Sequence, residues 1–291
     1  MTHSKRRLSV GKRQPVVPHK SFGSLPPVIP PPPISGFPNV TNTGVPTGTS
    51  LTVVNGDITT SSNGQVFDAL DVRGMILVQH ADVTIKRCKV YSVIDINPFY
   101  GDNRALAARL LVYDCTIGPP VAAKGNQGIT TGSFDCQFLR NNISNCEHGV
   151  WQEGNGGLIQ DNYLHDFIPY NPVTDPHIDG LQIPFGPTGS PTPYISNCIM
   201  RHNNVDLTPS GQPSYVSASI TMKDAGSITI DNNRLNGGSY VVYFNGTTSG
   251  CTVTNNRFGA FQFGYVDGDS PNVQSYSGNV VDSTGQPLSL P

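Results

Sequence analysis

The sequence predicts an all-β protein in which short strands follow one another in a repeating coil. Three observations predict this class. The chain of 291 residues is rich in turn formers, with 31 glycines and 25 prolines, and only 13% of its residues are charged. Its apolar runs are short and β-branched, and none has the three-four spacing of an amphipathic helix. Turn signals such as Asn-Gly separate these runs too often to leave room for helical crossovers.

Residues 1–38 are predicted to form an extended tail. Basic residues occupy its first half and prolines its second, where Pro30 to Pro33 favour polyproline II geometry. Two interpretations stay open, a disordered linker and a docking arm that orders against a partner. With either, we expect the tail to be dispensable for folding and needed for attachment to a larger assembly. No apolar segment follows Arg6-Arg7 and no run reaches membrane-spanning length, so export is expected by another route, such as lysis.

Residues 39–291 are predicted to form one solenoid domain. An apolar run followed by asparagine recurs in FLRNNIS, LIQDNYL, IMRHNNV, ITIDNNRL and VTNNRF, with a weaker last copy in SYSGNVV. The repeated asparagines are Asn142, Asn162, Asn204, Asn233, Asn256 and Asn279. A strand-only repeat with a period in the low twenties predicts a parallel β-helix, in which each coil buries its apolar face by stacking on its neighbours. Asparagine at a fixed corner suits a left-handed bend and can hydrogen-bond the asparagine of the next coil.

Cysteine usage and net charge limit the chemistry. The six cysteines form no Cys-x-x-Cys spacing, so neither zinc nor a redox motif is predicted. Cys88, Cys115 and Cys136 each follow a strand-like run at the same place in the repeat, and we expect free buried thiols rather than disulfides. A net charge of −2 disfavours nucleic acid and acidic membranes as partners. No cofactor and no metal site are predicted, although oxygen-rich corners leave calcium open.

The coils resemble the right-handed parallel β-helix, or pectate-lyase-like, superfamily. Within them, residues 42–90 resemble the first coil of tail-associated β-helix proteins from actinobacteria and their phages. The resemblance implies a carbohydrate ligand, because polysaccharide lyases, glycoside hydrolases and phage tailspikes belong to this superfamily. It also implies a possible homotrimer, since tailspikes are often trimers.

The function expected from this resemblance is that of a phage tail protein, tailspike-like, that binds a host cell-surface polysaccharide, with cleavage left open. The tail of residues 1–38 would contact other virion proteins, and the protein would reside in the virion or outside the cell. Two alternatives stay open: a bacterial polysaccharide lyase or glycoside hydrolase, and a non-catalytic virion decoration protein.

Strand alternation predicts which side chains face outward between residues 150 and 245. The choice that leaves the fewest polar groups in the core places these side chains inward: Val150, Leu181, Ile183, Ile220, Met222, Val242 and Phe244. The outward face then carries Trp151, Glu153, Gln182, Thr221, Lys223, Tyr243 and Asn245. We expect this face to be a sugar groove in which Trp151, Gln182, Tyr243 and Asn245 bind substrate.

The segment from His177 to Gln182 is the sharpest local motif. Its pattern, His-x-Asp-Gly-x-Gln, resembles a segment of many β-helix proteins in which the histidine and the aspartate both face the groove. The alternative interpretation is a plain turn at Asp179-Gly180. The region also holds His148 and Asp175 as weaker candidates.

The predicted catalytic residues are His177, Asp179, Glu153 and Lys223. A hydrolase needs two carboxylates that flank the glycosidic bond, which Asp179 with Glu153 or Asp175 could supply. A lyase needs a cation that neutralises a uronate and a base that removes a proton, which Lys223, His177 or Arg201 could supply. The sequence leaves these two reactions open.

Overall fold

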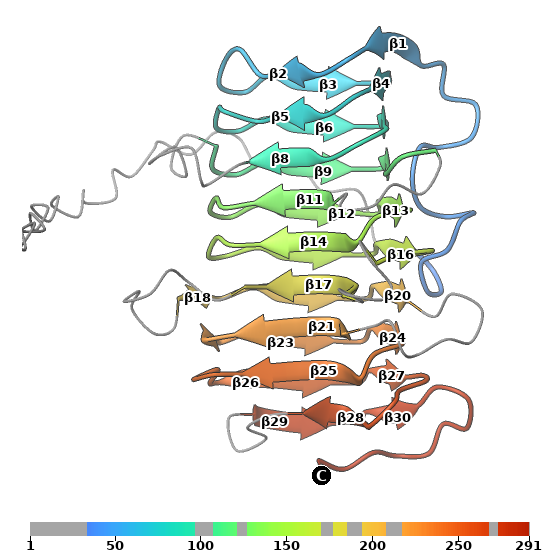
Figure 1. Cartoon of the computed structure of the whole chain (residues 1–291), viewed down its shortest axis with the longest axis vertical. Coiled ribbons are helices and arrows are strands. Elements are labelled where there is room, and N and C mark those ends of the chain that lie inside the picture. The colour runs from blue at the N-terminus through green and yellow to red at the C-terminus, as the bar shows by residue number, and fades with distance from the viewer. Residues whose placement is uncertain are drawn as a thin grey trace, which may run out of the picture. The chain divides into compact units, whose positions relative to one another are not determined.

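The computed structural model of the chain describes residues 34–96, 107–120, 127–169, 177–184, 194–207, 217–267 and 273–290. Within these ranges every regular element is a β-strand, and no helix is present. The strands lie in flat layers that repeat along one axis, as Figure 1 shows. The predicted all-β class and the stacked parallel coils are therefore confirmed. None of the described residues belongs to a helix that is long and apolar enough to cross a membrane.

Three parallel sheets run the length of the solenoid, and each coil contributes one strand to each sheet. Sheet A contains β1 (Thr52–Asn55), β4 (Leu70–Arg73), β7 (Lys89–Val90), β10 (Thr116–Ile117), β13 (Asn142–Ser144), β16 (Tyr163–His165), β20 (Asn204–Asp206), β24 (Arg234–Asn236), β27 (Arg257–Phe258) and β30 (Val280–Val281).

Sheet B follows sheet A in each coil. It contains β2 (Ile58–Thr59), β5 (Ile76–Leu77), β8 (Ile94–Ile96), β11 (Gln127–Thr131), β14 (His148–Gln152), β17 (Asp179–Ile183), β21 (Ala218–Lys223), β25 (Tyr240–Asn245) and β28 (Gly264–Asp267).

Sheet C closes each coil before the chain returns to sheet A. It contains β3 (Val66–Asp68), β6 (Thr84–Lys86), β9 (Leu111–Tyr113), β12 (Gln137–Leu139), β15 (Leu158–Gln160), β19 (Ile199–Arg201), β23 (Thr229–Asp231), β26 (Cys251–Thr254) and β29 (Val273–Ser277). A small separate pair joins β18 (Ile195–Ser196) to β22 (Ala225–Gly226).

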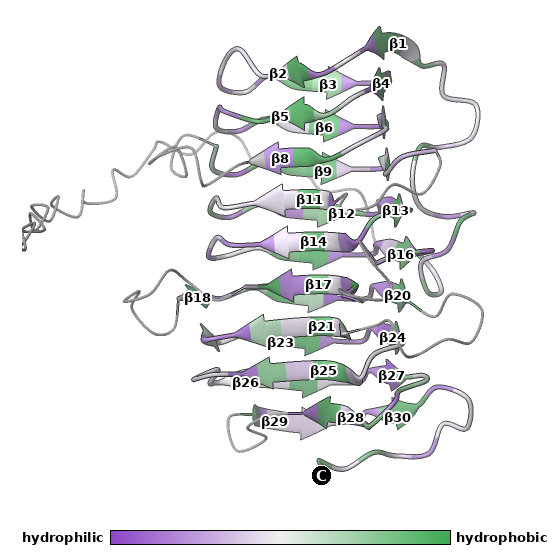
Figure 2. Ribbon diagram, viewed as in Figure 1, coloured by the Kyte–Doolittle hydropathy of each residue, from purple (hydrophilic) through white to green (hydrophobic). Residues whose placement is uncertain are grey.

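Equivalent apolar side chains of successive coils form rows in the core. Val150 is in register with Leu181, Leu181 with Ile220, and Ile220 with Val242, and all four are fully buried. Phe244 is 2% exposed in the adjacent row. Figure 2 shows apolar and polar residues interspersed along many strands, as expected when one side of each strand faces the core. The predicted inward positions are confirmed.

A ladder of buried asparagines runs along the turn between sheets C and A. Each side-chain Nδ2 donates to the Oδ1 of the next asparagine over 3.0 Å, and the same Oδ1 accepts the backbone N–H of the preceding one. The ladder consists of Asn141, Asn162, Asn203, Asn233, Asn256 and Asn279. The prediction was right for four members and wrong by one residue for Asn142 and Asn204, which lie in strands of sheet A. In both places two asparagines are adjacent, and the repeat pattern alone does not tell which of them joins the ladder.

The two roles predicted for the corner asparagine belong to different residues. The left-handed bend is made by the residue before each ladder position, as at Arg140, Asp161 and His202, with φ between 52° and 59°. The ladder asparagine itself supplies only the amide contacts. Its Nδ2 also donates to a carbonyl of the preceding coil, for example from Asn203 to Ile159 over 2.9 Å, so the buried amide is well paired.

All six cysteines are free and buried, as predicted. Cys115 and Cys88 continue the asparagine column upward, since the Cys115 N–H donates to Asn141 Oδ1 over 3.0 Å and the Cys88 N–H to Cys115 Sγ over 3.4 Å. Cys136 lies elsewhere, directly before β12, so the expectation that it shares their place in the repeat is wrong. Each of the three cysteines directly follows a charged residue, and this local likeness does not fix the place in the repeat.

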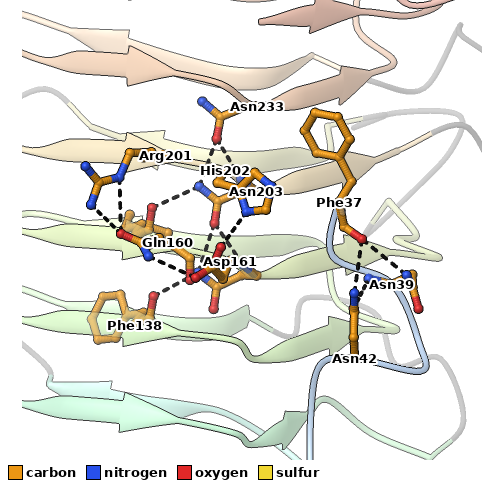
Figure 3. Close-up of polar contacts among 12 residues, drawn as sticks. Phe37, Asn39, Asn42, Phe138, Gln160, Asp161, Arg201, His202, Asn203 and Asn233 are labelled. Atoms are coloured by element: carbon orange, nitrogen blue, oxygen red, sulfur yellow. Dashed lines mark hydrogen bonds and ion pairs between the residues drawn. The ribbon is translucent and has the colours of Figure 1, made fainter. Parts of the chain in front are cut away.

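Residues 37–45 lie against sheet A and are called the N-terminal segment below. Phe37 stacks on His202 with ring centroids 5.3 Å apart (Figure 3). The Asn204 amide donates to the Pro38 carbonyl over 2.9 Å. Further along, the Gly44 N–H donates to the Arg140 carbonyl over 2.9 Å. Residues 37 and 38, which the predicted tail includes, thus contact the solenoid, and residues 1–33 of that tail lie outside the described part of the chain.

Candidate functional site

Four neighbouring strands of sheet B, β14, β17, β21 and β25, build the candidate site. In each of them the second and third residues are both buried, as Gly180 and Leu181 are in β17. Strict alternation is therefore interrupted once per strand. As a result the first residue of the strand, such as His148 or Asp179, points to the same outer side as the fourth, such as Trp151 or Gln182.

Gly180 explains the central glycine of the His-x-Asp-Gly-x-Gln motif. A Cβ at this position would lie 2.4 Å from Val205 Cγ1 and 2.5 Å from the Ser219 carbonyl oxygen. Only glycine lets the strand approach its neighbours this closely. The interpretation of Asp179-Gly180 as a turn is wrong, because both residues belong to β17.

A groove with a volume of about 590 Å³ opens over β17, β21 and β25. It is lined by His177, Asp179, Gln182, Ile183, Pro184, Ser217, Thr221, Lys223, Ser239, Tyr240, Tyr243, Asn245 and Phe263. Six of the eight predicted site residues therefore line one groove. Tyr240 and Phe263 were missed by sequence reasoning. Tyr240 is the first residue of β25 and is separated from Tyr243 by two buried residues, so strict alternation would place these two tyrosines on opposite sides. Phe263 belongs to a turn, where strand alternation does not apply.

Trp151 and Glu153 do not line this groove. Trp151 is in register with Gln182 on the neighbouring strand, and its indole N–H donates to Glu153 Oε1 over 2.8 Å. Its ring also packs edge-on against His148, with ring centroids 5.7 Å apart. The expected stacking platform is thus one coil away from the groove and engaged by its own neighbours.

Asp179 is the most unusual titratable group in the groove. Its residue is only 4% exposed, and Oδ1 has no hydrogen-bond partner among the described residues. Burial raises the pKa of this carboxyl to about 7, although the charge of His177 and the backbone N–H of Ala218 lower it. A carboxyl with this pKa can donate or accept a proton near neutral pH.

The opposite end of the groove is aromatic. Tyr240 lies 6.0 Å from Tyr243 and 5.8 Å from Phe263 between ring centroids, and Phe263 is 63% exposed. Burial, followed by the charge of Asp267, raises the pKa of Tyr243. Tyr240 thus contacts both other rings, and the three form a hydrophobic wall beside polar groups. Such a wall can stack the apolar faces of flat or ring-shaped ligands.

Asp95 was missed at the sequence level. Registers Asp95–Thr130 and Thr130–Trp151 place it on the same outer column of sheet B, two coils from Trp151. Burial, followed by the charge of Glu153, raises its pKa to about 6. The sequence signal that could have found it is the alternation Ile-Asp-Ile in β8, which places Asp95 on the outer side of the strand.

The remaining candidates are dispersed. Arg201 lies in β19 on sheet C, where its guanidinium donates to Gln160 Oε1 over 2.6 Å, so it does not line the groove. Asp175 lies outside the described residues. In the described part of the chain, no group of three or more His, Cys, Asp or Glu side chains is arranged to hold a metal ion.

The fold and the site together define a solenoid of parallel coils that carries a groove on one of its three long sheets. A family model described as "Right handed beta helix region" matches residues 72–285. Because this match covers more than half of the chain, the chain belongs to the right-handed β-helix family. No curated protein matches the chain, and no solved structure does.

Proposed function

We propose that this protein binds a polysaccharide in the groove of sheet B and cleaves it by acid–base chemistry centred on Asp179. One observation carries the proposal: a buried carboxyl with a pKa of about 7 lies in an open groove together with an aromatic wall. The family match adds support, because pectate-lyase-like and tailspike-like carbohydrate-binding proteins share this fold. Fold alone does not select an activity, so the argument rests on the groove.

The composition of the groove favours β-elimination over hydrolysis. Among the described lining residues, Asp179 is the only carboxylate and Lys223 the only ammonium group. A hydrolase needs a second carboxylate across the bond. In an elimination, Lys223 neutralises the uronate and Asp179 or His177 removes the C5 proton. The C4–O bond then breaks, its electron pair leaves with the oxygen, and a C4–C5 double bond forms.

Binding on a glycan array, followed by product analysis on the best ligand, tests this function. We expect products that carry the ultraviolet absorbance of an unsaturated uronate. New reducing ends without that absorbance would identify a hydrolase. Binding without products would leave a recognition protein, and no binding at all would contradict the proposal.

A matched variant separates recognition from chemistry. Asp179→Asn keeps the shape of the side chain and removes its titrating group, so binding is expected to persist while cleavage is lost. Normal cleavage by this variant would show that Asp179 has only a structural role.

The same proposal places the protein on the tail of a phage, with the glycan on the surface of the host cell. The basic, proline-rich composition of residues 1–38 and the resemblance of residues 42–90 support this location. Mass spectrometry of purified tailed particles is expected to find the chain among the structural proteins. Its absence would contradict the location and leave the groove chemistry untouched. Light scattering of the purified chain tests the trimer that tailspikes suggest.

A further inference from the structure

Three titratable side chains meet where β14 and β17 begin. His148 and Asp179 are in register on these adjacent strands, and His148 Nδ1 lies 3.5 Å from Asp179 Oδ2. On the other side of the imidazole, Nε2 lies 4.0 Å from Glu147 Oε1. The side chains are 13%, 5% and 11% exposed for His148, Asp179 and Glu147. One imidazole thus lies between two carboxylates in a mostly buried cluster.

The imidazole is held in this position by a neighbouring ring. Trp151 packs edge-on against His148 at an interplanar angle of 80°, and its own N–H is anchored on Glu153 at 2.8 Å. Trp151, which the sequence suggested as a sugar platform, therefore orients His148. This contact leaves Nδ1 of the imidazole facing Asp179.

The surroundings of the cluster come from three adjacent strands and the residue that precedes β17. On the side of β21, the backbone N–H of Ala218 donates to the Asp179 carboxylate. Further titratable or charged groups near the cluster or in the same groove are Glu153, His177, Lys223, Tyr240 and Tyr243.

Two mostly buried carboxylates that flank the same imidazole are unstable if both are ionised without a compensating cation. A proton on either Asp179 or His148 relieves the repulsion from Glu147. The two groups lie 3.5 Å apart, so a small approach that forms a hydrogen bond between them lets them exchange this proton. Groups that interact this strongly titrate as a unit with apparent pKa values that belong to the pair.

We propose that His148 and Asp179 share one proton, that Glu147 retains this proton in the cluster, and that His148 acts as a positioning residue for the Asp179 carboxyl. This deepens the proposed function and rests on it for its catalytic meaning. A carboxylate that exchanges a proton with a neighbouring imidazole can accept a proton as a base and pass it to the imidazole. It can then take up a proton again and act as an acid in the same pH range.

The test is a titration of the full chain by NMR without any glycan. The ring signals of labelled His148 and the carboxyl signal of Asp179 are followed with pH, and each is assigned by its disappearance in His148→Phe or Asp179→Asn. In the wild-type protein both signals are expected to change together in two steps. The upper step marks loss of the last shared proton.

Each of three substitutions is expected to lower the pH of this upper step by about 1 or more. Glu147→Gln removes the negative charge that retains the proton, while Asp179→Asn and His148→Phe remove one of the two sites. The remaining partner should then titrate in a single step. Glu147→Gln is nearly isosteric and keeps the test usable if His148→Phe does not fold.

Separate single-step titrations of His148 and Asp179 in the wild-type protein, unchanged when the other residue or Glu147 is replaced, would overturn the proposal. Because no glycan is present, the result is independent of the proposed cleavage. A protein that cuts no glycan yet shows the coupled titration would contradict the function and retain the proton-sharing pair. A protein that cleaves a glycan while His148 and Asp179 titrate independently would support the function and contradict the proton-sharing pair.

Discussion

Asn162 and Asn203 are 41 residues apart in the chain, yet the Nδ2 of Asn162 donates to the Oδ1 of Asn203 over 3.0 Å. Other neighbours in the ladder are 21, 23 or 30 residues apart, so the ladder stays in register although the interval varies. Each rung joins one coil to the next through side chain and backbone at once. The ladder therefore sets the stacking of the coils independently of the length of the loops.

Replacing a ladder residue is expected to cost much more stability than its size suggests. In Asn203→Ala, the amide of Asn162 loses its acceptor and the Ile159 carbonyl loses a donor. Since each unsatisfied buried polar group costs about 1–3 kcal/mol, we expect a loss of about 3 kcal/mol or more in the free energy of unfolding. Urea denaturation measures it, with Gln274→Ala on the exposed side of β29 as the control. Equal effects of the two variants would argue against the ladder.

The inward and outward sides of β25 provide a second test. Phe244 is 2% exposed, and Phe244→Ala should destabilise the protein by about 3–5 kcal/mol because it leaves a cavity in the stacked core. Tyr243→Ala, one residue away on the outer side, should have a small effect. Thermal unfolding of the two variants checks the register, which a reversed order of stabilities would contradict.

The N-terminal segment is expected to stabilise the solenoid through its contacts with sheet A. Phe37→Ala removes the ring that stacks on His202, and aromatic pairs contribute about 0.5–1.5 kcal/mol beyond their burial. Val40→Ala serves as the control, because Val40 is 63% exposed. Deletion of residues 1–33 is expected to leave the melting temperature unchanged, whereas deletion of residues 1–45 should lower it. A large effect of the shorter deletion would contradict the dispensability of those residues.

Gly44 fixes the path of this segment and allows a sharper version of that test. It has φ of +80°, and a Cβ there would lie 2.7 Å from Thr116 Oγ1. Gly44→Ala should therefore lower the melting temperature of the full chain, as the deletion of residues 1–45 does.

Asp179 should make the stability of the folded protein depend on pH. Its pKa is raised to about 7 from an ordinary value of 3.8. A carboxyl with a raised pKa in the folded state contributes stability that is fully present below pH 3.8 and is lost as the pH rises through about 7. The melting temperature of the wild-type protein relative to Asp179→Asn should thus fall over this interval.

Ligand binding should depend on the aromatic wall more than on Trp151. Tyr243→Ala and Phe263→Ala remove rings that line the groove, so each is expected to weaken glycan binding by about 1 kcal/mol or more. Trp151→Ala should leave binding close to normal and alter the pH dependence of cleavage, because Trp151 orients His148. Calorimetric titration with the array ligand checks this order. Weaker binding by Trp151→Ala alone would restore the original sugar-platform hypothesis.

Several features of the site could be predicted from local pattern alone. The outward positions Gln182, Lys223, Tyr243 and Asn245 follow from strand alternation, and all line the groove. Strand alternation gave wrong or missing positions where two neighbouring residues are both buried and where the chain turns. His148 and Asp179 share the outer side only because two consecutive residues of each strand are buried, and Phe263 comes from a turn.

Repetition along the chain determined the architecture of this protein, because a strand of fixed length that ends in the same polar corner can bury its apolar side only by stacking on a copy of itself. The sequence alone therefore indicated the solenoid, the inward rows and most of the asparagine ladder. Only the tertiary structure decided which titratable groups meet. The number of residues between Glu147 and Asp179 carries no information about register. The contact of His148 with Asp179 arises from the pairing of β14 with β17. Burial, which sets the pKa of Asp179, is likewise a property of the stacked coils and not of the residue or its neighbours in sequence.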